Sequence, residues 1–97
     1  MSSDKELVQR VLLLNDRTAY SGLVRKYQAS VRSYLFRLTR TREFADDLAQ
    51  ETFLNGYRHL DQLREHDKFR TWIFSVAHSE FLQWHRSHKT FESSEGY

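Results

Sequence analysis

The chain has 97 residues, a length that allows one small domain with a single hydrophobic core. Pro is absent and Gly occurs only 3 times, so the sequence lacks the turn signals of a sheet protein and favours an all-α bundle. The formal net charge is +2, which excludes a polycation. No apolar run approaches the ~18 residues of a membrane span, so direct membrane insertion is not expected. Cys is absent, which excludes disulfides and fits a reducing, cytoplasmic location.

Two helices are predicted in the first part of the chain. Ser3 and Glu6 form a possible capping box ahead of an apolar repeat, which predicts a short helix that ends near Leu14. The pair Asn15-Asp16 is then a turn and cap signal. Apolar residues recur after it at spacings of three and four. This pattern predicts a long helix from about residue 17 to 40, antiparallel to the helix that follows.

Thr41 can cap a third helix, which ends near Leu60 and has two different faces. One face is apolar and predicts core residues: Ala45, Leu48, Ala49, Thr52, Phe53, Gly56 and Leu60. The other face sets one leucine among acids and an amide at i, i+3, i+4 and i+7. We call it the docking stripe; its members are Asp47, Gln50, Glu51 and Leu54. Folding does not require this second stripe, so the pattern indicates a partner.

A polar loop over residues 61–68, with Leu63 as its single apolar member, precedes a fourth helix. Asp67 can cap this helix, which is expected to end near His88. Its inner face contains Phe69, Ile73, Val76, Ala77 and Trp84, and its outer face contains Thr71, Ser75, His78, Ser79, Leu82 and Arg86. Trp72 and Phe74 flank the inner face. Rings that stack on bases beside polar groups that reach phosphates favour a surface for single-stranded nucleic acid. The alternative is that both rings only widen the core.

Evidence for an enzyme is weak, and no cofactor is expected. The sequence has no Gly-rich phosphate loop, no HExxH pair and no nucleophile elbow. The carboxylates of Asp46, Asp47 and Glu51 are interpreted as a solvated acidic face. His78, His85 and His88 have spacings that would suit zinc or nickel. Surface or nucleic-acid-facing histidines are the preferred interpretation, and a metal-binding bundle is a third hypothesis.

Three linked segments carry a family resemblance: Asp47–Phe53, Tyr57–Asp61 and Phe69–Ala77. In order and spacing they closely resemble region 2 of the extracytoplasmic-function (ECF) group of bacterial sigma factors. The first two predicted helices are similar to that family as well. The resemblance implies a compact bundle of about four helices. In the family this domain docks on the clamp helices of the RNA polymerase β′ subunit, and it recognises and melts the minus-ten promoter element.

By position, the resemblance makes the docking stripe the polymerase-binding surface. The loop and the outer face of the fourth helix would hold the non-template strand and capture a flipped base. The DNA-binding residues implied in this way are Leu63, Arg64, His66, Arg70, Thr71, Trp72, Ser75, His78, Ser79 and Arg86. An anti-sigma factor is a further expected partner. Residues 1–90 would form the domain and residues 91–97 a frayed tail or the start of a linker. The family's second domain has no counterpart in this sequence, so we expect a fragment of a longer protein, with a stand-alone region 2 module as the alternative.

Several residues depart from the family pattern. Glu65-His66-Asp67 stands where Gly-Asp is common, Leu63 where an aromatic residue is frequent, and Ser79 where the base pocket often has Asn. These changes leave a second hypothesis open, a decoy for an anti-sigma factor that no longer reads DNA. Glu80 falls near the centre of the inner face. We expect it to lie near the helix end or to pair with an arginine of the second helix, because a buried unpaired carboxylate is costly.

Overall fold

In the computed structural model, the backbone is described for residues 3–96 and the side chains for residues 3–88. This part of the chain forms four α-helices: α1 (Asp4–Leu14), α2 (Arg17–Thr39), α3 (Arg42–Arg58) and α4 (Phe69–Gly96). Two short 3-10 helices, η1 (Leu60–Gln62) and η2 (His66–Lys68), connect α3 to α4. The prediction of an all-α bundle of about four helices is therefore confirmed.

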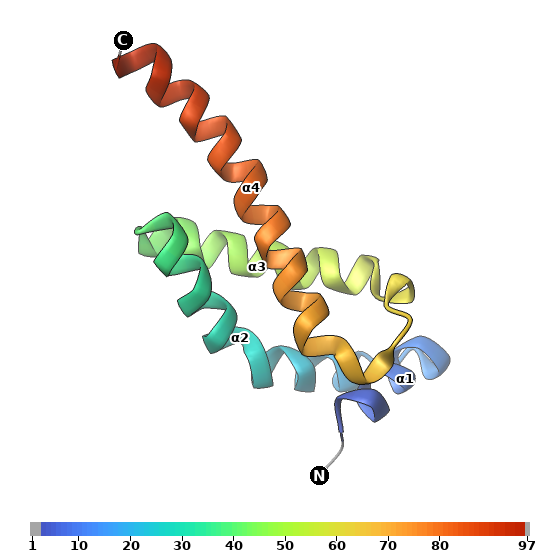
Figure 1. The fold of residues 1–97 in the computed structure, drawn as a ribbon. Helices are drawn as coiled ribbons and strands as arrows, with labels where there is room; N and C mark the ends of the chain where they lie inside the picture. Colours follow the sequence, from blue (N-terminus) through green and yellow to red (C-terminus); the bar gives the residue numbers. More distant parts are fainter. Residues whose placement is uncertain (1–2, 97) are drawn as a thin grey trace.

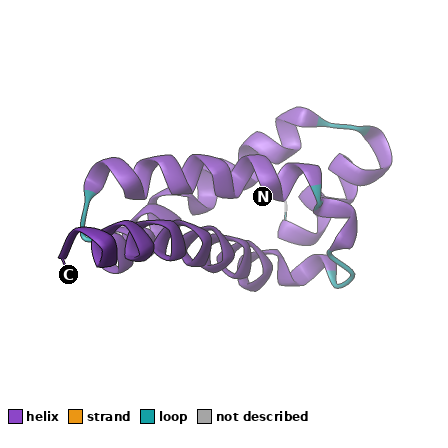
Figure 2. Ribbon diagram, turned by 90° about the horizontal axis from the view of Figure 1, so that it is seen from above, coloured by secondary structure: helices purple, strands orange, loops and turns teal. Residues whose placement is uncertain are grey.

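The helices α2 and α3 form an antiparallel pair, and α4 crosses this pair on one side (Figure 1). The short helix α1 lies at the end of the bundle where α2 begins and where α4 starts. The second half of α4 extends toward the end where α2 turns into α3, and this turn is the loop at the left of Figure 2. The predicted antiparallel arrangement of the second and third helices is correct.

Side-chain caps define the starts of α1 and α2. The Glu6 backbone N–H donates to Ser3 Oγ at 3.2 Å, and the Ala19 N–H donates to Asp16 Oδ1 at 3.1 Å. Both caps satisfy backbone donors that the first helical turn leaves without partners. Thr41 occupies the N-cap position of α3, but its hydroxyl donates to the Thr39 carbonyl at 3.4 Å instead of capping.

The core is formed by the predicted inner faces of the helices. All seven residues of the apolar face predicted for the third helix are buried, although Leu60 lies in η1, and so are Phe69, Ile73 and Ala77 of α4. Tyr20 of α2 lies among them, and its hydroxyl donates to the Phe53 carbonyl at 2.5 Å. Burial raises the pKa of Tyr20, and the nearby Tyr57 adds to the effect. The ring of Tyr20 also meets those of Tyr57 and Phe69 edge to face, at 5.1 and 6.5 Å between centroids.

Three further details differ from the sequence-based predictions. The segment between α3 and α4 is built from the 3-10 helices η1 and η2, and Asp67 lies inside η2 instead of capping α4. The helix α4 continues past His88 to Gly96, so residues 91–96 have a helical backbone, while Tyr97 lies outside the described residues. Glu80 is half-buried, and its partner is Asn55 of α3, which donates Nδ2–H to Glu80 Oε2 at 2.6 Å, in place of an arginine of α2.

Candidate functional site

The docking stripe lies on the side of α3 that faces solvent. Asp47, Gln50 and Glu51 are exposed, and Leu54 is 46% exposed, which is high for a leucine. The position of the stripe follows from helical geometry, because α2 and α4 cover the opposite side of α3. Thr52 shows how well that opposite side is packed: it is fully buried, and its hydroxyl donates to the Leu48 carbonyl at 2.7 Å.

A groove of about 530 Å³ runs between α2 and α3 along one edge of the docking stripe. Gln50 and Leu54 belong to both the stripe and the groove. The side chains that α2 contributes are Tyr20, Val24, Gln28 and Arg32. Sequence reasoning missed this contribution. Its signal was the repeat of Val24, Gln28 and Arg32 at intervals of four residues, which places them on one face of α2.

The connection between α3 and α4 forms a second concave surface. We call it the loop hollow; its volume is about 540 Å³, and its lining residues are Gln62, Leu63, Arg64, Glu65, Lys68, Thr71, Trp72 and Ser75. The structure thus brings together Arg64, Thr71, Trp72 and Ser75, which the sequence singled out for DNA binding. Gln62, Glu65 and Lys68 belong to the predicted loop but were not named among the DNA-binding residues, and only the tertiary structure shows that they line the same hollow.

Two residues that line the loop hollow also pack in or against the hydrophobic core. Leu63 is 6% exposed, so its side chain belongs to the hydrophobic core and offers little surface to a ligand. Trp72 is half-buried against Phe69, with 6.0 Å between ring centroids. The ring of Trp72 therefore widens the core, which was one of its two sequence-based interpretations, and it also lines the hollow.

The other predicted DNA-binding residues do not line the loop hollow. Arg70 is exposed and lies over the ring of Phe74, at 5.9 Å from its centroid. His78 is exposed, and its Nδ1 lies 3.0 Å from the hydroxyl of Tyr34, a contact that orients the imidazole. Ser79 and Arg86 are also exposed on α4, whereas His66 is half-buried in η2.

The histidines of α4 are engaged with aromatic rings. His85 stacks on Phe81 with 5.4 Å between centroids, and His88 stacks on Trp84 with 4.5 Å. Among the side chains that the structure describes, no three His, Asp or Glu groups lie close enough together to hold a metal ion. The described helices also include none that is both long and apolar enough to cross a lipid bilayer.

The structure is thus a helical bundle that carries the docking stripe and the loop hollow on its surface. Comparison of the sequence with known protein families identifies its family. The chain belongs to the Sigma-70 region 2 family, whose family model matches residues 23–91. The predicted resemblance is thereby confirmed.

Several curated relatives are sigma factors. RNA polymerase sigma factor YlaC of Bacillus subtilis is 35% identical over 82 residues, which are 84% of this chain and 47% of YlaC. ECF RNA polymerase sigma factor SigM of the same species is 36% identical over 63 residues, 65% of this chain and 38% of SigM. The RNA polymerase sigma-H factor of Pseudomonas aeruginosa is 36% identical over 74 residues, 76% of this chain and 38% of that protein. The chain therefore spans less than half the length of each of these relatives. No solved structure matches it.

Proposed function

We propose that the chain is the part of an ECF-type sigma factor that binds RNA polymerase through the docking stripe and reads minus-ten promoter DNA through the loop hollow. The observation that carries the proposal is the position of these two surfaces on a Sigma-70 region 2 fold. The residues of the docking stripe are not needed by the core, the loop hollow has the exposed side chains of Arg64, Thr71 and Ser75, and both surfaces overlap segments of the family resemblance. An anti-sigma factor would compete for the docking stripe.

The chemistry of the docking stripe suits a basic helical partner. Asp47 and Glu51 supply negative charge that helps to steer encounter with a basic surface, and the amide of Gln50 can both donate and accept. Leu54, at the edge of the α2–α3 groove, offers an apolar anchor that a partner helix would bury. The proposed partner is the clamp of the β′ subunit.

The chemistry of the loop hollow suits an unstacked base. Its volume of about 540 Å³ lies within the range of ~300–1,000 Å³ that is usual for small-molecule sites. Trp72 provides an aromatic wall, while Arg64 and Lys68 provide cations for adjacent phosphates. In this proposal DNA melts without ATP, because capture of the flipped base and of the single strand compensates for unstacking.

The docking part is tested by the binding of the purified chain to a β′ clamp fragment. Leu54→Asp and Glu51→Lys should each weaken binding at least tenfold while the circular dichroism spectrum stays helical. Leu82→Asp is the matched control, because Leu82 is 42% exposed, close to the value for Leu54, but lies on α4. Equal binding by the Leu54→Asp and Leu82→Asp variants would refute the docking stripe.

The DNA part is tested by fluorescence titration with single-stranded oligonucleotides that carry a minus-ten-like or a scrambled sequence. Trp72→Ala should remove the preference between them. Because Trp72 also packs in the core, Arg64→Glu provides a second variant on an exposed side chain of the hollow. If the wild-type chain shows no sequence preference and neither variant loses affinity, the chain is the decoy and does not read DNA.

A further inference from the structure

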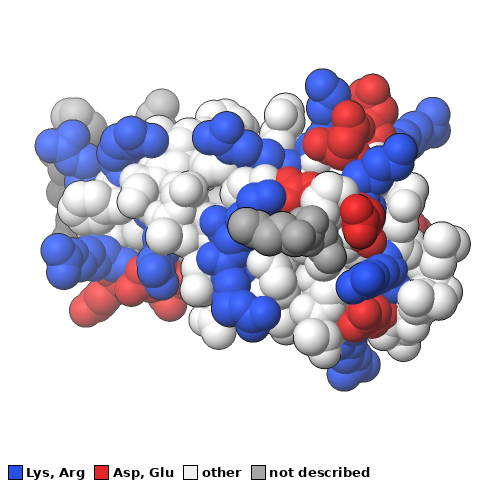
Figure 3. Space-filling model, turned by 90° about the horizontal axis from the view of Figure 1, so that it is seen from below, with Lys and Arg blue, Asp and Glu red and all other residues white. Residues whose placement is uncertain are grey.

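Arginine side chains gather where α2 turns into α3. A hollow of about 580 Å³ lies there, lined by Arg32, Ser33, Phe36, Arg37, Arg42, Ala45 and Asp46. The same end of the molecule is at the left of Figure 3, where Lys and Arg side chains are prominent beside a smaller acidic group. This hollow is separate from the loop hollow, which lies at the opposite end of α3.

Among the side chains that the structure describes, the positive charge of this hollow is not balanced by the acids that line it. Its single acid, Asp46, lies 3.8 Å from Arg32 in a loose and exposed ion pair. Within the residues that the structure describes, Arg37 and Arg42 form no ion pair and no side-chain hydrogen bond. Their guanidinium groups are exposed, and a planar guanidinium matches the geometry of a phosphate with two parallel hydrogen bonds.

An exposed ring lies among these cations. Phe36 is 42% exposed, and it lines the hollow together with Arg37 and Arg42. The core gains little from a phenylalanine in this position. Rings beside guanidinium groups are the combination that holds single-stranded nucleic acid, because bases stack on the ring while the cations take the phosphates.

The turn between the two helices carries a further arginine in an uncommon conformation. Arg40 has φ 63° and ψ 17°, the left-handed region that Gly or Asn usually occupies at the end of a helix. Folding alone would favour Gly here, because Gly adopts this conformation without a steric penalty. An arginine at this position is explained if its exposed side chain serves a ligand.

We propose that Phe36, Arg37, Arg40 and Arg42, which we call the basic corner, bind the phosphodiester backbone of nucleic acid. The basic corner would add a sequence-independent contact with DNA phosphates to the base-reading contact proposed for the loop hollow. The phosphate contact at the basic corner does not depend on base reading by the loop hollow. The basic corner and the loop hollow lie at opposite ends of α3, whose 17 residues span about 25 Å. This distance corresponds to about 7 nucleotides of DNA at ~3.4 Å each. A single DNA molecule longer than this could contact both sites.

The test measures DNA affinity by fluorescence anisotropy at several salt concentrations between about 50 and 200 mM, the range over which phosphate contacts weaken strongly. The probes are a duplex and a single strand, each much longer than the distance between the two sites. In the Arg37→Glu/Arg42→Glu variant, affinity should fall at least tenfold on one or both probes. The slope of log K against log salt should decrease in magnitude by about 1.4–1.8, since each of the two lost phosphate contacts removes ~0.7–0.9. The probe that loses more affinity identifies the form of DNA that the corner binds.

A control with the same change of net charge separates a site from general electrostatics. The Arg10→Glu/Arg17→Glu variant carries the same charge change on α1 and at the start of α2, and both side chains are exposed. It should retain most of the wild-type salt slope. If the two double variants lose affinity equally, or if the Arg37→Glu/Arg42→Glu variant keeps the wild-type slope, the basic corner is not a binding site. Equally tight, Arg37-dependent binding of polyglutamate would also overturn the proposal, because it would indicate an acidic protein partner.

Arg40→Gly supplies a second, independent readout. Relief of the left-handed conformation should raise the urea midpoint, while the loss of the guanidinium should lower DNA affinity. A raised midpoint with unchanged affinity would show that Arg40 serves only the turn, and it would remove Arg40 from the site.

Trp72→Ala keeps the two DNA proposals distinguishable. It should abolish the preference for the minus-ten-like sequence, whereas the corner variants should weaken both sequences equally. If Trp72→Ala has no effect and the corner variants behave as expected, the base-reading proposal fails and the basic corner stands. The reverse pattern removes the corner and leaves the base-reading site.

Discussion

Gly56 of α3 lies close to both α2 and α4, and the absence of a side chain there leaves room for Tyr20 and Ile73. A Cβ atom at this position would lie 2.7 Å from Ile73 Cδ1 of α4 and 2.9 Å from the hydroxyl of Tyr20 of α2. Both distances are shorter than any normal contact, so a methyl group would force these side chains to move. The sequence placed Gly56 on the core face of α3, but it did not show that the position must be Gly.

We therefore predict opposite effects for the same substitution at two glycines. Gly56→Ala should destabilise the domain by about 1–3 kcal/mol, because overpacking outweighs the better helix propensity of Ala. Gly22→Ala should stabilise it by about 0.5–1 kcal/mol, because the nearest atom to the new methyl group is Leu7 Cδ1 at an ordinary 3.8 Å. Urea denaturation of both variants checks the pair, and a stabilised Gly56→Ala variant would contradict this account of the packing.

Tyr20 makes the stability of the fold sensitive to alkaline pH. Burial raises the pKa of Tyr20, whereas a tyrosine in the unfolded chain ionises near pH 10. Above pH 10 the unfolded state loses a proton that the folded state keeps, so the free energy of unfolding falls as pH rises. The loss approaches about 1.4 kcal/mol per pH unit for this group.

The Tyr20→Phe variant should show a smaller loss of stability between pH 10 and 11 than the wild-type protein does. At pH 8 it should be about 1 kcal/mol less stable, because the hydrogen bond to the Phe53 carbonyl is lost. Urea midpoints at these pH values provide the measurement. Tyr27 and Lys26 also have raised pKa values, so part of the alkaline loss should remain in the variant. An identical pH dependence of the two proteins would rule out Tyr20 as the source.

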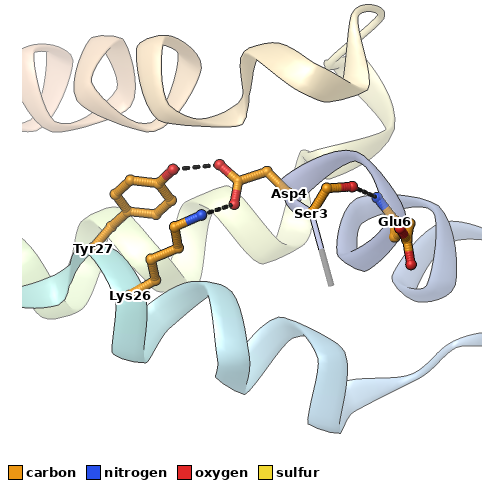
Figure 4. A network of polar contacts seen from close by, with 5 residues as sticks. All are labelled: Ser3, Asp4, Glu6, Lys26 and Tyr27. Carbon is orange, nitrogen blue, oxygen red and sulfur yellow. Dashed lines mark hydrogen bonds and ion pairs between the residues drawn. The ribbon is translucent and has the colours of Figure 1, made fainter. Parts of the chain in front are cut away.

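At the scale of the element, one carboxylate fastens α1 to α2. Asp4, in the first turn of α1, accepts a hydrogen bond from the Tyr27 hydroxyl and lies 2.7 Å from Lys26 Nζ (Figure 4). The hydrogen bond to Asp4 is the main cause of the raised pKa of Lys26, while burial is the main cause for Tyr27.

Asp4→Ala should lower the free energy of unfolding by about 1–2 kcal/mol, because it leaves the half-buried Tyr27 hydroxyl without its acceptor. Amide hydrogen exchange should become faster in α1 in particular. Lys26→Met is the matched variant, and it should leave the urea midpoint nearly unchanged because Lys26 is exposed and solvent screens its charge. Equal destabilisation by the two substitutions would show that the charge pair, and not the tyrosine contact, fastens the helix.

The elements show where local sequence patterns are sufficient. The apolar face of α3 and the inner stripe of α4 were predicted from the 3.6-residue period, and their central residues are buried. The connection over residues 61–68 was predicted as a polar loop, yet two 3-10 helices form between α3 and α4, and Leu63 is buried in the core. The end of α4 was predicted too early, because polar residues after His88 were interpreted as a tail although no Gly or Pro stops the helix before Gly96.

At the scale of the whole molecule, the two proposed surfaces are separated. The docking stripe faces away from the core on α3, while the loop hollow lies at the start of α4. We predict that Leu54→Asp abolishes clamp binding without changing oligonucleotide affinity, and that Arg64→Glu does the opposite. Energies of substitutions that share no contacts usually add within about 0.5 kcal/mol, so the double variant should show the sum of both effects. Binding of each partner to each variant is the measurement, and strong non-additivity would indicate that the surfaces are coupled.

The sequence by itself determined the all-α class, the helix starts at Ser3 and Asp16, the buried faces and the exposed docking stripe. These features depend on local periodicity and on caps within one turn of the helix, so neighbouring residues contain the information. Only the tertiary structure decided the partner of Glu80, the α2 wall of the groove, the loop hollow and the basic corner. The physical reason is that these sites join side chains from different elements, and their proximity depends on how the helices pack.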